Sequence, residues 1–327
     1  MRPKQILTRA ALSIFSRFGM TPPVSRRSVV YAWWPDGRVL PVSPQDGFFY
    51  QPCIHPDGTC VAFHGNTRGP LRVWCTKFDS LNTYPLTHET STAIHPSYSW
   101  DGTQLVFASD RAWNVPPLEV ESLPESFDDD TLSARFDIYV STAAGDNVNR
   151  LTTAESADRR PSFSPDGKSV AFVSDRHGVT DIWLQRVDQG ESSAHPIGIS
   201  EKGWSPRRPW FSADGEWIYF YGQRLNSPEH RICRAAASGS DIAPLPNDTS
   251  GCSHGPFVDP GGRTLLMHSR TNGPFTIWEL PLDGGEAKPI PPPGVTRALH
   301  PTRSRNGVIA FDVPSLNTQW ASLFTRR

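Results

Sequence analysis

Short stretches in which apolar and polar residues alternate recur along most of this chain, and each is bounded by Gly, Pro, Asn or Asp. Alternation with a period of two residues is typical of half-buried β-strands. Residues 169–176 read Ser-Val-Ala-Phe-Val-Ser-Asp-Arg, and residues 181–184 read Asp-Ile-Trp-Leu. The pattern predicts an all-β fold.

A turn tripeptide that ends in Gly separates pairs of these strands. Its copies end at Gly58, Gly102, Gly167, Gly215, Gly262 and Gly307. The spacings between them are 44, 65, 48, 47 and 45 residues. Asp-Gly and Asn-Gly pairs supply the positive φ of a tight hairpin, and one propeller blade takes about 40–50 residues. The repeat therefore predicts a six-bladed β-propeller of four-stranded antiparallel blades.

Strands from both ends of the chain are expected to close this propeller. Residues 38–42 can supply an outer strand and residues 308–312 an inner one, whereas residues 29–34 and 319–324 compete for one position. We therefore expect a single propeller over residues 28–327.

Two segments fall outside the repeat. Residues 1–27 form a basic extension, with six Lys or Arg and no acid in the first 35 residues, and fit a capping helix or a targeting-like segment. The 65-residue step carries an acidic insertion at about residues 111–135, which fits either a lid or a solvated loop.

The repeat has four linked elements in fixed order. These are Pro-x-x-Ser-Pro-Asp-Gly near residue 165, Ala-Phe-x-Ser-Asp-Arg near residue 174, Asp-Ile-x-x near residue 182 and Leu-Thr at residues 151–152. Over about residues 28–325 this order resembles the TolB family of WD40-like propeller repeats. The resemblance implies the propeller fold; the extra α/β domain of TolB, and with it the transport role, is not expected in this chain.

Composition narrows the function classes. The net charge of −1 and a pI near 6.8 exclude a broad basic footprint for nucleic acid. No run approaches the roughly 18 apolar residues of a transmembrane helix. Five cysteines without a CxxC spacing favour reduced, packed thiols, hence a cytoplasmic location, although the basic extension leaves targeting or export open. We expect a monomer.

Chemistry is expected at one mouth of the central channel. The residue before the repeated Pro should start the innermost strand of every blade, so these residues should form a ring. Its predicted members are Gln51, His95, Arg160, Arg208, His254 and His300, with His254 one residue out of register. A water-filled polar lining explains the same residues without any function.

A functional ring would divide into two kinds of site. Gln51, His95, His254 and His300 could bind a divalent metal such as Mn, Zn or Ca, with one His as the catalytic base. Arg160 and Arg208 would bind a carboxylate or phosphate of the substrate. Oligogalacturonate lyases, which are propellers of similar repeat type, resemble this chain in those ligand types and imply manganese chemistry.

Two functions follow from this ring. One is binding, with metal-assisted lyase or hydrolase cleavage, of an anionic small molecule or acidic saccharide. The other is a non-catalytic propeller that binds a protein or peptide partner on the same face. Since propellers support both, the fold does not choose between them.

Overall fold

The computed structural model describes residues 26–67, 69–88, 90–113, 115, 135–227, 230–245, 254–270 and 273–316. Residues 1–25, most of the acidic insertion (116–134), and Cys252 lie outside the described residues. The expectations for the N-terminal extension, the lid and the domain limits therefore stay predictions.

Four blades are separate four-stranded antiparallel sheets. One blade consists of β7 (Ala93–Tyr98), β8 (Gln104–Ser109), β9 (Asp137–Thr142) and β10 (Asn149–Arg150), and the next of β11 (Arg159–Phe163), β12 (Ser169–Ser174), β13 (Asp181–Arg186) and β14 (His195–Pro196). The third consists of β15 (Trp204–Phe211), β16 (Trp217–Arg224), β17 (His230–Ala236) and β18 (Ile242–Pro244). The fourth consists of β19 (His254–Val258), β20 (Thr264–Ser269), β21 (Thr276–Pro281) and β22 (Lys288–Pro289). Two short 3-10 helices, η2 (Glu191–Ser193) and η3 (Ser200–Lys202), lie between β13 and β15.

The remaining strands form one eight-stranded sheet that contains both ends of the described chain. It consists of β23 (Leu299–Arg303), β24 (Ile309–Leu316), β1 (Arg26–Trp33), β2 (Val39–Pro41), β3 (Phe48–Ile54), β4 (Cys60–Asn66), β5 (Arg72–Lys77) and β6 (Thr83–Pro85). Its two halves meet at a single parallel pair, Ser28 with Phe48. Strand β1 pairs with β24 along its whole length, so it fills the position for which residues 319–324 also competed.

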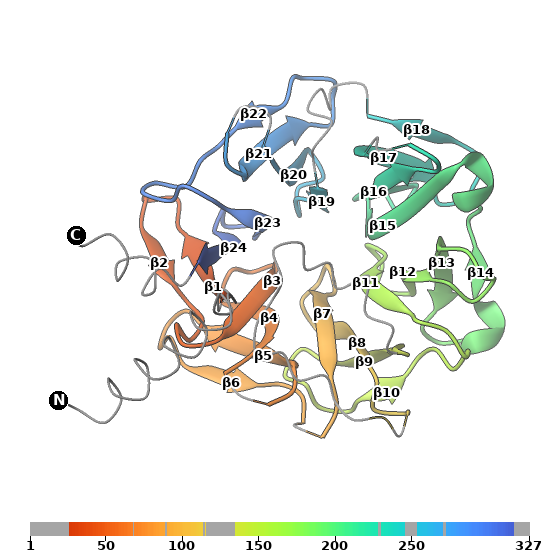
Figure 1. Ribbon diagram of the computed structural model, residues 1–327, viewed down its shortest axis with the longest axis horizontal. Helices are drawn as coiled ribbons and strands as arrows, with labels where there is room; N and C mark the ends of the chain where they lie inside the picture. The colour runs from red at the N-terminus through yellow and green to blue at the C-terminus, as the bar shows by residue number, and fades with distance from the viewer. Residues whose placement is uncertain are drawn as a thin grey trace, which may run out of the picture.

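The sheets stand around a central axis, and the same strand of each unit lies nearest to it (Figure 1). We call these six the first strands: β3, β7, β11, β15, β19 and β23. The prediction of an all-β propeller with four-stranded antiparallel blades is confirmed.

The turns predicted from the repeat share one geometry. All six of their final glycines have φ between 68° and 85°. Each of these glycines donates its N–H to the carbonyl oxygen three residues earlier, as Gly58 does to His55. Left-handed backbone of this kind is open to Gly without steric cost, which is why the Asp-Gly motif marked the hairpins correctly.

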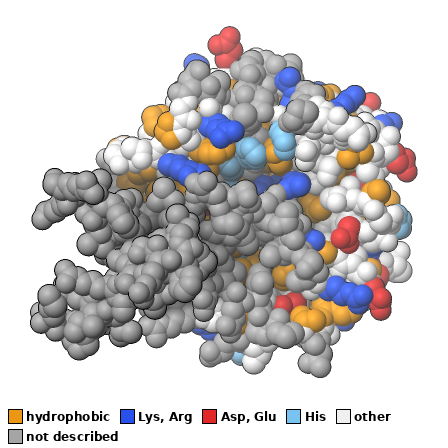
Figure 2. Space-filling view, in the orientation of Figure 1, with side chains coloured by type: hydrophobic (Ala, Val, Ile, Leu, Met, Phe, Trp, Pro, Cys, Tyr) orange, Lys and Arg blue, Asp and Glu red, His pale blue; other side chains and the backbone are white. Residues whose placement is uncertain are grey.

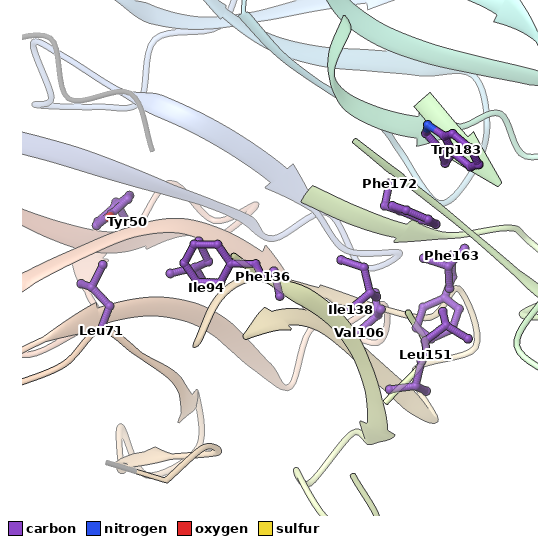
Figure 3. Packing of buried hydrophobic residues seen from close by; sticks show 13 residues of the cluster. Tyr50, Leu71, Ile94, Val106, Phe136, Ile138, Leu151, Phe163, Phe172 and Trp183 are labelled. Atoms are coloured by element: carbon purple, nitrogen blue, oxygen red, sulfur yellow. The ribbon is translucent and has the colours of Figure 1, made fainter. Parts of the chain in front are cut away.

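Apolar side chains of neighbouring blades interlock between the sheets. Figure 3 shows one such cluster, which contains Phe136 and Ile138 from one blade and Phe163 and Phe172 from the next. These four side chains are at most 1% exposed. Burying a side chain of this size stabilises the fold by roughly 1.5–3 kcal/mol, so such clusters fix each blade against its neighbour.

The described cysteines are free thiols, as expected. Cys53, Cys75 and Cys233 are buried and Cys60 is half-buried. Burial raises the pKa of Cys53 to about 11, so this thiol stays protonated and accepts a hydrogen bond from the Tyr98 N–H at 3.4 Å.

Candidate functional site at the channel mouth

Each first strand is interrupted where a residue precedes Pro. The pairing with the second strand shifts register there in all six units. The residue before Pro has a left-handed backbone every time, with φ between 50° and 63°. We call these residues the channel ring: Gln51, His95, Arg160, Arg208, Gly255 and His300.

Five ring positions hold residues other than Gly, although each costs roughly 1–2 kcal/mol in this conformation. Strain of this kind persists only where the surrounding structure holds it, and it gathers at functional sites. The repeated bulge therefore points to a selected arrangement of side chains at this mouth.

The ring lines a cavity of about 80 Å³ at the centre of one face. Gln51, His95 and Arg160 are at least nine-tenths buried in its wall, and Arg208 and His300 are half-buried. Figure 2 shows Lys, Arg and His side chains gathered around the hollow on this face. Five of the six ring members predicted from the sequence are thus brought together.

The sixth predicted member is not. Gly255 occupies the ring position, with φ of 63°, because it is the residue directly before Pro256. His254 lies one residue earlier, pairs with His268 across the sheet, and stacks on its imidazole with 5.5 Å between ring centroids. His254 does not line the cavity.

The floor of the cavity is built by the residues that follow the ring by two positions. Trp210 and Phe257 pack there with 4.7 Å between ring centroids. Together with Cys53, they also line a second cavity of about 20 Å³ that faces the Asp-Gly turns. The two aromatic rings therefore lie between the two cavities.

Three polar residues on second strands hold the ring from behind, and the sequence analysis missed them. They accept hydrogen bonds from ring N–H groups of the next unit. These bonds run from His95 to Nδ1 of His64 at 3.4 Å, from His300 to Nδ1 of His268 at 3.2 Å, and from Gln51 to Oδ1 of Asp312 at 3.1 Å. The available signal was a polar residue at a buried position of an otherwise apolar strand, as in Ile-Ala-Phe-Asp-Val.

Burial decides the charge of these groups. Burial, and after it the positive charge of Arg208, lower the pKa of His254 to about 3. The pKa of His268 is also well below its usual value, first through burial and then through His300. Both imidazoles are therefore neutral at pH 7. Burial raises the pKa of Asp312 to about 7, against the opposing effect of the Gln51 N–H.

The two sides of the ring differ in their polar contacts. Asp312 Oδ1 lies 2.6 Å from Nδ1 of His300, so a carboxyl and an imidazole share a hydrogen bond at the cavity wall. On the other side, Arg160 Nη1 donates to Oε1 of Gln51 at 3.4 Å. The guanidiniums of Arg160 and Arg208 both stay charged at any physiological pH.

The predicted metal site has no counterpart in the arrangement of the described side chains. Among them, no group of three or more His, Cys, Asp or Glu residues could hold a metal ion. With His254 away from the cavity, Gln51, His95 and His300 remain as potential ligands. Metal binding stays a prediction.

The fold and this site together define a β-propeller whose repeated bulges place one residue per unit at the mouth of a central channel. The chain belongs to the family of TolB beta propeller domains, since the PD40 profile of that family matches residues 130–296. The TolB homolog of Chlorobium chlorochromatii is 30% identical over 141 residues, which are 36% of this chain and 32% of that protein. The match thus spans about a third of that relative.

Solved structures agree on the fold. A putative TolB from Agrobacterium tumefaciens superposes with a TM-score of 0.65 at 18% identity, over 89% of this chain and 99% of that one. An oligogalacturonate lyase from Vibrio parahaemolyticus gives 0.50 at 12% identity, over 90% and 98%. Both resemblances expected from the sequence are confirmed, and at these identities they show the fold alone.

None of the helices in the described part is long and apolar enough to span a bilayer. The cytoplasmic location expected from the cysteines finds no support in these relatives.

Proposed function

We propose that this protein is a non-catalytic binding propeller that takes an anionic group of a protein or peptide partner into the ring cavity. The observation that carries the proposal is the pair of guanidiniums, Arg160 and Arg208, in a wall whose described residues include no Asp or Glu. The nearest carboxyl described above, Asp312, has a pKa of about 7 and lies behind His300. The cavity is therefore positive, and paired guanidiniums favour a carboxylate or phosphate.

The cavity is too small for a whole ligand, which favours a partner that places only one anionic group in it. Sites for whole small molecules usually measure about 300–1,000 Å³. A cavity of about 80 Å³ accepts one anionic group and little more. The rest of the ligand then lies on the surrounding face, where a protein or peptide makes its further contacts.

An anionic small molecule or acidic saccharide, cleaved by lyase or hydrolase chemistry, is the second candidate. It is favoured by the pair of Asp312 and His300, because a carboxyl with a pKa near 7 is suited to general acid–base catalysis. Gln51, His95 and His300 would hold a divalent metal for this chemistry, and His254 would join them only after leaving His268.

We also propose that the eight-stranded sheet acts as two blades, which gives six in all. Each of its halves carries one ring residue, Gln51 or His300, and one turn glycine, Gly58 or Gly307. A single parallel pair joins the halves.

Calorimetric titration with two peptides tests the binding function. Acetyl-Ala-Ala-Glu with a free C-terminus carries two carboxylates, and acetyl-Ala-Ala-Gln amide carries none. We expect the first to bind, more weakly at high salt, and the second not to bind. Equal binding of the two would contradict the proposal. Turnover of an acidic oligosaccharide, with stoichiometric metal in the purified protein, would favour the second candidate.

A further inference from the structure

The loop between the second and third strands opens onto the face of the channel ring, and its charge differs among the blades. Where the second strand ends, Asp110 follows β8 and Asp175 follows β12, whereas Arg270 follows β20. The first residues of the third strands show the same division: Asp137 in β9, Asp181 in β13 and Thr276 in β21. The blade of β19–β22 thus carries a cation and a hydroxyl where the other two blades carry acids.

The acid after the second strand has a structural role that Arg270 cannot take. The carboxylate of Asp110 accepts from the Thr92 N–H at 2.7 Å. A guanidinium has no acceptor, so Arg270 makes no such bond. It is exposed, two residues after His268, which pairs with His254 beside the ring. The charge of Arg270 is therefore on the ring face, outside the cavity.

A second arginine reaches the same place from the neighbouring unit. Arg297 lies two residues before β23, and its Cζ is 5.8 Å from the centroid of the Phe275 ring. The Cζ of Arg270 is 5.5 Å from the same centroid. Cations this close to an aromatic ring are attracted to it. Phe275, which is half-buried, thus holds near one another two charges that would otherwise repel.

The charges around Phe275 continue to the ring cavity. Burial lowers the pKa of His254 first, and the further causes are the positive charges of Arg208, His230, Arg270 and Arg207. For His268, burial and His300 come first, and Arg208 and Arg297 are among the further causes. Arg208 in the cavity wall therefore acts on the same imidazoles as Arg270 and Arg297 outside it. We call four residues the basic sector: Arg207, Arg208, Arg270 and Arg297.

We propose that the partner bound at the ring carries a stretch of acidic residues, which lies across the basic sector from the cavity towards Phe275. One anionic group binds at Arg160 and Arg208, and acidic residues next to it in the partner meet Arg270 and Arg297. Clustered charges of one sign attract a polyanion more strongly than a single anion. The Phe275 ring beside them offers apolar contact to the methylenes of Glu side chains, which favours an acidic peptide. This inference rests on the proposed binding function and specifies the kind of partner sequence that is bound.

Two peptides of equal length test the basic sector. Acetyl-Gln-Gln-Gln-Gln-Ala-Ala-Glu and acetyl-Glu-Glu-Glu-Glu-Ala-Ala-Glu, both with free C-termini, share one group for the cavity and differ in the charge of the rest. Measured by calorimetry on the full chain in about 0.15 M salt, the second should bind about tenfold more tightly. This advantage should nearly disappear in about 1 M salt, where the screening length is about 3 Å. Either end of the second peptide can enter the cavity, so the direction of the chain does not affect the result.

Single substitutions locate the advantage. Arg270→Ala and Arg297→Ala should each reduce it about two- to fivefold and leave binding of the Gln peptide almost unchanged. Arg263→Ala is the matched control, since Arg263 is exposed in the same blade but follows the turn glycine Gly262 on the opposite face. That variant should bind both peptides like the wild type. If Arg297→Ala does not fold, Arg270→Ala alone decides.

The possible failures differ. Equal affinity of the two peptides, or an advantage unchanged in both arginine variants, would overturn the acidic stretch. Binding of both peptides that is lost in Arg160→Ala would in that case leave the binding function intact. Tighter binding of a short single-stranded DNA than of the Glu peptide would overturn an acidic peptide as the occupant. If neither peptide binds, the proposed function fails as well.

Discussion

The two sides of the channel ring have the same backbone but use their polar side chains differently. We call Arg160 and Arg208 the arginine side, and Gln51, His95 and His300 the histidine side. On the histidine side, a polar residue of the preceding second strand accepts each ring N–H: Asp312, His64 and His268, respectively. On the arginine side, the residues in the same register are Ala108 and Val173, which have no polar side-chain atom.

The histidine side therefore supports the ring backbone, and the arginine side carries the groups of the proposed anion site. On the histidine side, imidazole and carboxyl groups bond to backbone and to one another, so they stabilise the strained bulge. On the arginine side, long cationic side chains project from the same bulge and stay charged. A concentration of histidines at a channel mouth is thus compatible with a structural role, whereas the two arginines are the groups on which the proposed anion binding rests.

The largest expected effect tests recognition on the arginine side. Replacing Arg160 and Arg208 together by Ala should weaken binding of the free-acid peptides by about 3–6 kcal/mol, since each charged hydrogen bond is worth about 1.5–3 kcal/mol. Calorimetry measures this loss. Arg186→Ala is the control, because Arg186 pairs with Asp188 on the exposed outer surface. An equal loss in His95→Ala would abolish the distinction between the two sides.

The pH dependence of stability tests the support on the histidine side. The folded pKa of Asp312, about 7, lies above its usual value of 3.8, so the folded protein binds the extra proton. The stability from this group is therefore full below about pH 4 and is lost as the pH rises through 7. In this window it should fall by roughly 1.4 kcal/mol per pH unit.

Denaturant unfolding of the wild type and Asp312→Asn at several pH values isolates this contribution. The comparison is necessary because His254, whose pKa is lowered to about 3, changes stability in the opposite direction between pH 3 and 6.5. Parallel pH profiles for the two proteins would show that Asp312 does not titrate in this window.

A smaller effect is expected from removing the acceptor itself. Asp312→Ala leaves the buried N–H of Gln51 without its partner and should destabilise the protein by about 1–3 kcal/mol at pH 5. Asp312→Asn keeps an oxygen at that point and should cost less. If the two substitutions are equally costly, the hydrogen bond to the ring is not what Asp312 contributes.

The smallest effect concerns the strain of the ring. His95→Gly should be more stable than His95→Ala by about 1 kcal/mol, because Gly adopts φ of 56° without steric cost. The reverse change, Gly255→Ala, should destabilise, since its Cβ would lie 3.2 Å from the His268 ring. Thermal unfolding gives both values, and a more stable Ala variant at position 95 would argue against strain.

The sequence was informative where a local rule acts in every repeat. Gly after Asp or Asn marked the hairpins because few other residues adopt positive φ, and the Pro after each ring residue fixed the register of the ring. Reading that register strictly would have placed Gly255 in the ring instead of His254.

What escaped prediction depends on contacts between units. Asp312 bonds to Gln51, which is far away along the chain, and no local pattern reports such a bond. The aromatic floor of the cavity likewise needs Trp210 and Phe257 from neighbouring first strands to meet. Pairing of β1 with β24 was also left open by alternation alone, because several segments, residues 319–324 among them, had the same pattern.

The pairing of β1 with β24 has a consequence for synthesis of the protein in the cell. Arg26 leaves the ribosome long before its partner Leu316 is made. At 5–20 residues per second, β1 waits on the order of tens of seconds. During that time its edge is open to pairing with other chains. A nascent chain of this protein should thus depend on a chaperone until β24 has been made.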